Sequence, residues 1–101
     1  MTLDDLAATI AARQGADPDS SWTAKLLASG PEKCAEKFGE EAIEAIIEAI
    51  KGDREALISE AGDVLYHLLV MLQSRQVALA DVMENLSRRQ GTSGIAEKAS
   101  R

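Results

Sequence analysis

Apolar residues recur every three or four positions along most of this 101-residue chain, a spacing that predicts amphipathic α-helices. No stretch alternates between apolar and polar residues in the way that predicts a half-buried strand. The pattern therefore predicts an all-α fold of four to five helices. Their expected bounds are residues 3–14, about 21–28, 31–51, 54–74 and 79–89.

Residues that begin and end helices separate the two longest predicted helices. Pro31 occupies the first helical position that proline favours, and Gly52 stands where a helix commonly ends in a left-handed residue. Asp53 follows as an N-cap residue for the next helix. Because the connection is so short, the two helices are expected to fold back on each other as a central helical hairpin.

The apolar faces of this hairpin are wide. At about 100° per residue, one face of the helix over 31–51 gathers six apolar residues. They are Ala35, Phe38, Ala42, Ile43, Ile46 and Ile50. On the following helix, apolar residues cover well over half of the circumference, which is typical of a buried helix. We expect a second subunit to provide part of that burial.

Composition narrows the class of protein. A chain of 101 residues suits one domain, so residues 1–101 are interpreted as a single unit. The net charge of −6 argues against non-specific binding to nucleic acid or anionic membrane. A single cysteine, Cys34, allows no internal disulfide and indicates a reducing compartment. Since no basic leader and no apolar run of about 20 residues is present, we expect a cytoplasmic protein.

Two acidic steps interrupt the apolar pattern of the hairpin, Glu41-Ala-Ile-Glu44 and Glu60-Ala-Gly-Asp63. Residues three apart on a helix share a face, so each step projects two carboxylates in nearly one direction. If the two helices pack together, four carboxylates converge, and without a cation they would repel one another. Hard oxygen ligands of this kind suit Mg²⁺. The sequence therefore predicts one magnesium site.

A solvated helix surface is the common alternative for the glutamates of the first hairpin helix. It explains Glu60 and Asp63 less well, because they have few basic neighbours within one turn and are flanked by apolar residues. Glu40 projects away from Glu41 and suits an ion pair or a supporting position. His67, one turn beyond Asp63, is interpreted either as a supporting residue of the site or as an ordinary core histidine.

Basic residues form a second candidate group, suited to binding phosphates. Lys25 and Lys37 are expected to border the acidic hollow, although lysine at such spacing is also ordinary helix surface. Further basic residues surround the flexible segment Gly91-Thr-Ser-Gly94, in a tail (residues 91–101) whose backbone amides and basic side chains are able to close over an anion. They are Arg88, Arg89, Lys98 and Arg101. The alternative for this tail is a frayed, solvated C-terminus.

These motifs together resemble one known family. The runs Lys33-Cys-Ala-Glu-Lys-Phe-Gly-Glu-Glu-Ala-Ile-Glu44 and Glu60-Ala-Gly-Asp63-Val-Leu-Tyr-His67 are similar to the phosphoribosyl-ATP pyrophosphatase family of histidine biosynthesis. The segments 21–27 and 88–101 also resemble that family, so the likeness spans nearly the whole chain. The acidic pairs alone indicate only the wider all-α, MazG-like nucleoside triphosphate pyrophosphatases.

The resemblance implies an activity, a cofactor and an assembly. The expected reaction is the hydrolysis of phosphoribosyl-ATP to phosphoribosyl-AMP and pyrophosphate, the second step of the histidine pathway. Mg²⁺ is implied as the cofactor, and an intertwined helical-bundle homodimer, with sites shared between subunits, as the assembly. The implied metal ligands are Glu41, Glu44, Glu60 and Asp63, and the implied group that activates water is Glu41 or Glu40. The residues implied to bind phosphates are Lys25, Lys37, Arg88, Arg89, Lys98 and Arg101.

Two other functions remain open at the level of the sequence. A house-cleaning pyrophosphatase of free nucleoside triphosphates would share the metal site and would not need the basic tail. A helical oligomerisation module would use the acidic stripes as solvated surface and would have no activity.

Overall fold

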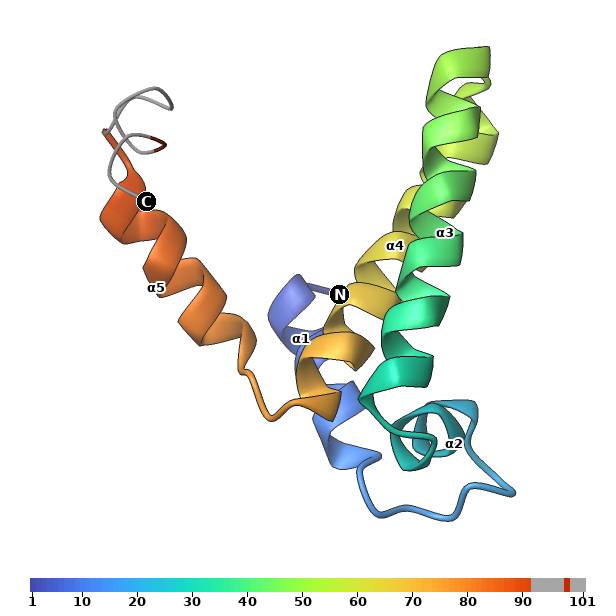
Figure 1. The fold of residues 1–101 in the computed structure, drawn as a ribbon, viewed down its shortest axis with the longest axis vertical. Helices are drawn as coiled ribbons and strands as arrows, with labels where there is room; N and C mark the ends of the chain where they lie inside the picture. The colour runs from blue at the N-terminus through green and yellow to red at the C-terminus, as the bar shows by residue number, and fades with distance from the viewer. Residues whose placement is uncertain (92–97, 99–101) are drawn as a thin grey trace.

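The computed structural model describes residues 1–91 and Lys98, and all regular structure in that part of the chain is helical. The helices are α1 (Leu3–Ala12), α2 (Trp22–Ala28), α3 (Pro31–Lys51), α4 (Arg54–Ser74) and α5 (Leu79–Arg89). Figure 1 shows α3 and α4 side by side as one long hairpin, with α1 and α2 at its base and α5 as a separate arm. The predicted all-α fold with a central hairpin is confirmed.

Side-chain caps account for most of the helix boundaries. Thr2 and Asp5 form a capping box at the start of α1: each side chain accepts a hydrogen bond from the other residue's backbone N–H, at 3.1 and 2.9 Å. Ser21 and Asp53 cap α2 and α4 through one such bond each. Gly52 ends α3 with φ of +79°, in the left-handed region that glycine tolerates.

One predicted boundary was wrong. The first helix ends at Ala12 and does not continue to residue 14. The backbone N–H groups of Arg13 and Gln14 bond to carbonyl oxygens only three residues back, those of Ile10 at 3.0 Å and Ala11 at 3.2 Å. This tighter bonding closes the last turn and ends the α-helical geometry.

A small core lies where the base of the hairpin meets α1 and α2. Its buried members are Ile10, Leu26, Leu27, Cys34, Leu69 and Val70. Cys34 has no exposed surface, and its Sγ lies 3.2 Å from the carbonyl oxygen of Leu26, to which it donates. Cys34 is therefore a small core residue.

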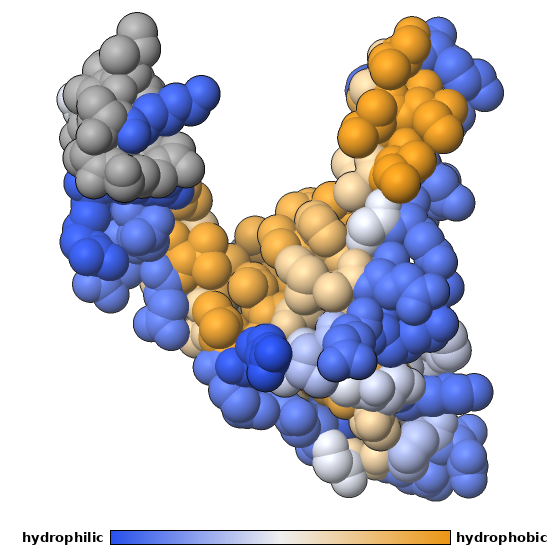
Figure 2. Space-filling model, viewed as in Figure 1, coloured by the Kyte–Doolittle hydropathy of each residue, from blue (hydrophilic) through white to orange (hydrophobic). Residues whose placement is uncertain are grey.

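The far half of the hairpin has a different surface, because its apolar residues are open to solvent in the single chain. Ile43 is 60% exposed and Ile50 is 80% exposed. The others in this group are Ile46, Ile47 and Ile58. Figure 2 shows this apolar surface on the inner side of the hairpin arm, facing the apolar side of α5 across the opening of a V. A single chain therefore buries only part of the apolar surface that the sequence pattern predicts to be buried.

The arm formed by α5 leaves the body through a tight turn after α4. Gln76 adopts φ of +58°, and the N–H of Val77 bonds back to the carbonyl oxygen of Leu72 at 3.0 Å. Beyond the turn, α5 makes no extensive contact with the other helices of the described chain. Met83 and Leu86 on its apolar side are about half exposed. No helix among the described residues is long and apolar enough to cross a membrane.

Candidate metal centre

The hairpin brings the two acidic steps together. One carboxylate oxygen from each of Glu41, Glu60 and Asp63 lies within 4.8 Å of the other two. Glu41 comes from the middle of α3, and the other two come from the facing turns of α4. The predicted convergence of the two steps is therefore present in the structure.

Glu44 completes the group of four. Burial raises the pKa of Glu41 and of Glu60, and hydrogen bonding to the Glu44 carboxyl and repulsion by its charge raise both further. The charge of Asp63 adds to the repulsion at each site. Glu44 thus stands between the two helices, close enough to act on a carboxylate of each. We call Glu41, Glu44, Glu60 and Asp63 the carboxylate cluster.

Within the described residues, no lysine forms an ion pair with the cluster. Lys33, Lys37 and Lys51 pair instead with other glutamates on α3. Oε2 of Glu60 is buried and has no hydrogen-bond partner among the described residues. Four hard oxygen ligands, mutual repulsion and an unpartnered buried oxygen are together the properties of a group that suits a divalent cation.

Glu40 lies apart from the cluster. Its Oε2 is 3.3 Å from Nζ of Lys37, one turn earlier on α3. The side chain of Lys37 is 28% exposed, and that of Glu40 is 50% exposed. The prediction that Glu40 projects away from Glu41 into an ion pair agrees with this geometry, and Lys37 lies beside the acidic stripe as expected.

Lys25 is placed differently from Lys37. It lies on α2, with Nζ 5.9 Å from the centre of the Trp22 ring, a distance that allows a cation–π interaction. Trp22 is 55% exposed, so it does not pack in the core. The two residues are three positions apart on α2, so the helical spacing accounts for their contact.

The basic residues near the C-terminus are not brought to the cluster within one chain. Arg88 and Arg89 end α5, on the arm opposite the hairpin (Figure 1). Lys98 is exposed, and Arg101 lies outside the described residues together with most of the predicted tail. A single chain therefore separates the carboxylate cluster from the basic group at the end of α5.

His67 is buried one turn beyond Asp63 on α4, with 7% of its surface exposed. Burial lowers its pKa; the charge of Asp63 opposes that shift, Lys37 adds to it and Glu40 opposes it. The neighbouring Tyr66 shares a hydrogen bond between its hydroxyl and that of Thr23 on α2. The sequence gives no periodic signal for this hydroxyl pair, because it joins residues 43 positions apart.

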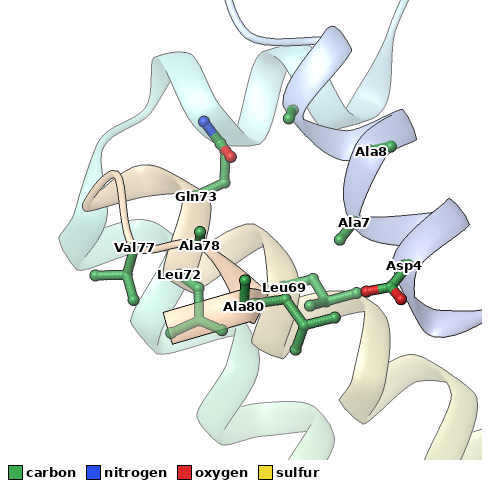
Figure 3. Close-up of a pocket in the computed structure, with 11 residues that line it drawn as sticks. Asp4, Ala7, Ala8, Leu69, Leu72, Gln73, Val77, Ala78 and Ala80 are labelled. Atoms are coloured by element: carbon green, nitrogen blue, oxygen red, sulfur yellow. The ribbon is translucent and has the colours of Figure 1, made fainter. Parts of the chain in front are cut away.

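A partly enclosed hollow among the described residues lies elsewhere. Figure 3 shows it between α1, the end of α4 and the start of α5, with a volume of about 240 Å³. Its wall is mainly alanine, leucine and valine, with Asp4 and Gln73 as the polar residues. None of the predicted site residues lines it, so the carboxylate cluster lies outside this hollow.

Fold and site together define a class: all-α proteins that carry clustered carboxylates on two antiparallel helices. The family model described as "Phosphoribosyl-ATP pyrophosphohydrolase" matches residues 3–90. The chain belongs to this family of enzymes. The resemblance found in the acidic motifs is thereby confirmed.

Curated relatives agree with the family model over nearly the full length. The chain is 79% identical to the phosphoribosyl-ATP pyrophosphatase of Dinoroseobacter shibae over 99 residues, covering 98% of this chain and 97% of the relative. It is 78% identical to that of Ruegeria pomeroyi, covering 98% and 94%. Identity to that of Cereibacter sphaeroides strain ATCC 17025 is 77%, covering 98% and 96%.

Proposed function

We propose that this chain hydrolyses phosphoribosyl-ATP to phosphoribosyl-AMP and pyrophosphate in the histidine pathway, with Mg²⁺ as its cofactor. Family membership over residues 3–90 supports the reaction. The observation that carries the metal part is the convergence of Glu41, Glu60 and Asp63 within 4.8 Å on the hairpin. The family favours this substrate over the free nucleotides of a house-cleaning enzyme.

The carboxylate cluster supplies the ligands in this proposal. Glu41, Glu44, Glu60 and Asp63 would hold the cation, which would also give the unpartnered Oε2 of Glu60 a partner. A bound Mg²⁺ neutralises a triphosphate and stabilises the charge that develops on a leaving pyrophosphate. Without it, burial raises the pKa values of Glu41 and Glu60, and hydrogen bonding to Glu44 and repulsion by the neighbouring carboxylates raise them further.

Activation of the attacking water requires a carboxylate close to the reacting phosphate. Of the two predicted candidates, Glu41 belongs to the cluster, whereas Glu40 is occupied by Lys37 at 3.3 Å. We therefore assign the water-activating role to Glu41. Glu40 then holds Lys37 beside the acidic residues of α3, where the ammonium group is available to a phosphate.

The remaining basic residues have to come from a second chain. Lys25 and Lys37 lie on the same body as the cluster, but Arg88 and Arg89 are on the other arm. We propose a homodimer in which the end of α5 of one chain, with Lys98 and Arg101 beyond it, binds phosphates at the hairpin of the other. The exposed apolar surfaces of Ile43, Ile50 and Met83 support such a dimer, since surfaces of this kind mark association sites. We place this dimer in the cytoplasm.

The activity is tested by measuring pyrophosphate release from phosphoribosyl-ATP, with ATP and dUTP as comparison substrates, with and without Mg²⁺. We expect release from phosphoribosyl-ATP alone and only with the cation. Equal or faster release from ATP or dUTP would move the protein to the general pyrophosphatases. Release that persists in a chelator would refute the role of the cation.

The shared site is tested by mixing two inactive variants, Glu60→Gln and Arg88→Ala. In a mixed dimer with shared sites, one site combines an intact cluster with an intact Arg88, so equilibrated mixtures recover about a quarter of the sites. If each chain uses its own Arg88, mixing recovers nothing. Analytical ultracentrifugation of the same samples establishes whether dimers are present.

A further inference from the structure

His67 is a buried polar side chain that lacks a partner. Its exposed fraction is 7%, and its Nδ1 is buried without any hydrogen-bond partner among the described residues. Buried imidazole nitrogens are normally hydrogen-bonded, because leaving one unpaired costs the whole of its lost hydration. The unpaired nitrogen therefore points to a bond that forms in another state of the protein.

The ring of His67 is held in place from one side. It meets the ring of Tyr66 edge to face, with centroids 4.9 Å apart and planes at 83°. Tyr66 is in turn held by the hydrogen bond between its hydroxyl and that of Thr23 on α2. This chain of contacts orients the imidazole from the base of the molecule, so that it is a rigid neighbour for the groups on its other side.

The charged groups that act on His67 all belong to the candidate site or its edge. They are Asp63 on α4, and Lys37 and Glu40 on α3. Lys37 and Glu40 are already paired with each other at 3.3 Å. Asp63 lies one turn before His67, at a separation that places the two side chains on the same helix face. Of the two carboxylates among them, Glu40 is paired with Lys37, whereas Asp63 forms no ion pair within the described part of the chain.

We propose that His67 is a positioning residue: its Nδ1–H donates a hydrogen bond to the Asp63 carboxylate and holds that carboxylate in the orientation that binds a divalent cation. The inference rests on the proposed metal function of the cluster. Ligating carboxylates generally depend on such a hydrogen-bonded neighbour for their orientation. An ionised carboxylate only accepts hydrogen bonds, so in this contact the proton is on Nδ1 of the imidazole.

An ordinary core histidine would behave differently when replaced. If His67 only fills space, an apolar residue at this position packs as well or better and leaves cation binding unchanged. If it positions Asp63, only a side chain with a polar atom near Nδ1 preserves binding. Asn matches the position of Nδ1 and Gln matches that of Nε2, which makes His67→Asn and His67→Gln a matched pair, with His67→Leu as the apolar control.

The experiment measures binding of Mn²⁺ to the substrate-free protein by electron paramagnetic resonance, which reports free Mn²⁺ and does not require activity. We expect His67→Leu and His67→Gln to weaken Mn²⁺ binding by about 10- to 100-fold, and His67→Asn to stay within a few-fold of the wild type. Thermal melting checks folding, and if His67→Leu fails to fold, the Asn and Gln pair still decides. Pyrophosphate release by His67→Gln should return towards the wild-type rate at saturating Mg²⁺.

The outcomes separate this inference from the function on which it rests. If the wild-type protein binds Mn²⁺ and all three variants bind it with the same affinity, the positioning role is overturned and the metal site stands. Equal weakening in His67→Asn and His67→Gln would also overturn it, because Nδ1 would then have no special part. If the wild-type protein and Asp63→Asn both fail to bind Mn²⁺, the metal function itself is wrong and the role of His67 falls with it.

Discussion

The base of the molecule and its two arms are built from similar apolar residues and bury them very differently. At the base, α1, α2 and the ends of the hairpin close over Ile10 and Cys34, whose exposed fractions are 2% and 0%. On the hairpin arm, Ile50 is 80% exposed, and on α5 Met83 is 51% exposed. The base buries its apolar residues within one chain, whereas the arms leave theirs exposed to solvent in the single chain. The carboxylate cluster lies on the hairpin arm. The candidate site therefore belongs to the region whose apolar side chains are largely exposed in the single chain.

The largest effect is expected at the cluster itself. Glu60→Gln should lower pyrophosphate release by at least about 100-fold, because it removes a ligand and a charge from a site that works by electrostatic stabilisation. Its melting temperature without cation should rise, because one source of repulsion is gone. Glu36→Gln, an exposed change on the same hairpin, is the matched control and should alter neither quantity. A Glu60→Gln protein with wild-type activity would exclude the cluster from catalysis.

Two identical substitutions contrast the base with the arm. Ile10→Ala removes a fully buried side chain and should lower the free energy of unfolding by about 2–5 kcal/mol. Ile50→Ala should cost less within the chain and act mainly by weakening the dimer. Its loss of unfolding free energy should therefore be small at concentrations where the protein is monomeric and should grow to a plateau as dimers form. Denaturant titrations at several protein concentrations measure both. A concentration-independent loss in Ile50→Ala would show that its exposure in the single chain is not an interface.

The pH dependence of stability should also reveal the cluster. Because the folded-state pKa values of Glu41 and Glu60 are raised above 4.5, folding favours their protonated forms. The resulting stability is present below about pH 4.5 and is lost as the pH rises through the folded pKa values. His67 acts in the opposite direction: its lowered pKa removes stability as the pH falls through 6.5.

The comparison of wild type with Glu60→Gln isolates the contribution of the cluster from that of His67. In melting curves of the cation-free proteins, the advantage of Glu60→Gln should be small near pH 4.5 and grow towards neutral pH. Added Mg²⁺ should reduce that advantage by stabilising only the wild type. A constant difference across this range would contradict the coupling between Glu60 and its neighbours.

The smallest effect is expected at the junction of the body and the α5 arm. Gln76 has φ of +58°, a conformation that costs a non-glycine residue about 1 kcal/mol. Gln76→Gly should relieve that strain, but it loses the hydrogen bond from the Gln76 side chain to Gln14 at 3.2 Å and gives the unfolded chain more freedom. A net change within about 1 kcal/mol is therefore expected in denaturant titrations. A large loss would show that the Gln14 contact holds α5 in place.

The fold was largely predictable because its signals are local. Pro31, Gly52 and Asp53 act on their own backbone and immediate neighbours, so the bounds of α3 and the start of α4 follow from residue type. The end of α1 was missed by two residues because no residue type marks the change from four-residue to three-residue hydrogen bonding at Arg13. The exposure of apolar side chains on the hairpin was anticipated only indirectly, through the expectation that a second subunit provides part of their burial.

The candidate site divides in the same way. The spacing of Glu41, Glu44, Glu60 and Asp63 indicated shared helix faces, and the hairpin brings those faces together. The hydroxyl pair of Thr23 and Tyr66 left no sequence signal, because it depends on where α2 docks against α4.

The sequence by itself determined the helices, their caps and the pairing of acidic steps, because each depends on residues within a few positions of one another. It also carried the family membership that the comparison over residues 3–90 bears out. Only the tertiary structure decided that Glu60 and His67 each bury an unpartnered polar atom, and that α5 and the hairpin form separate arms. Those properties depend on how helices that are far apart in the sequence dock, and on which side chains that docking leaves exposed. Neither can be inferred from a local pattern of residues.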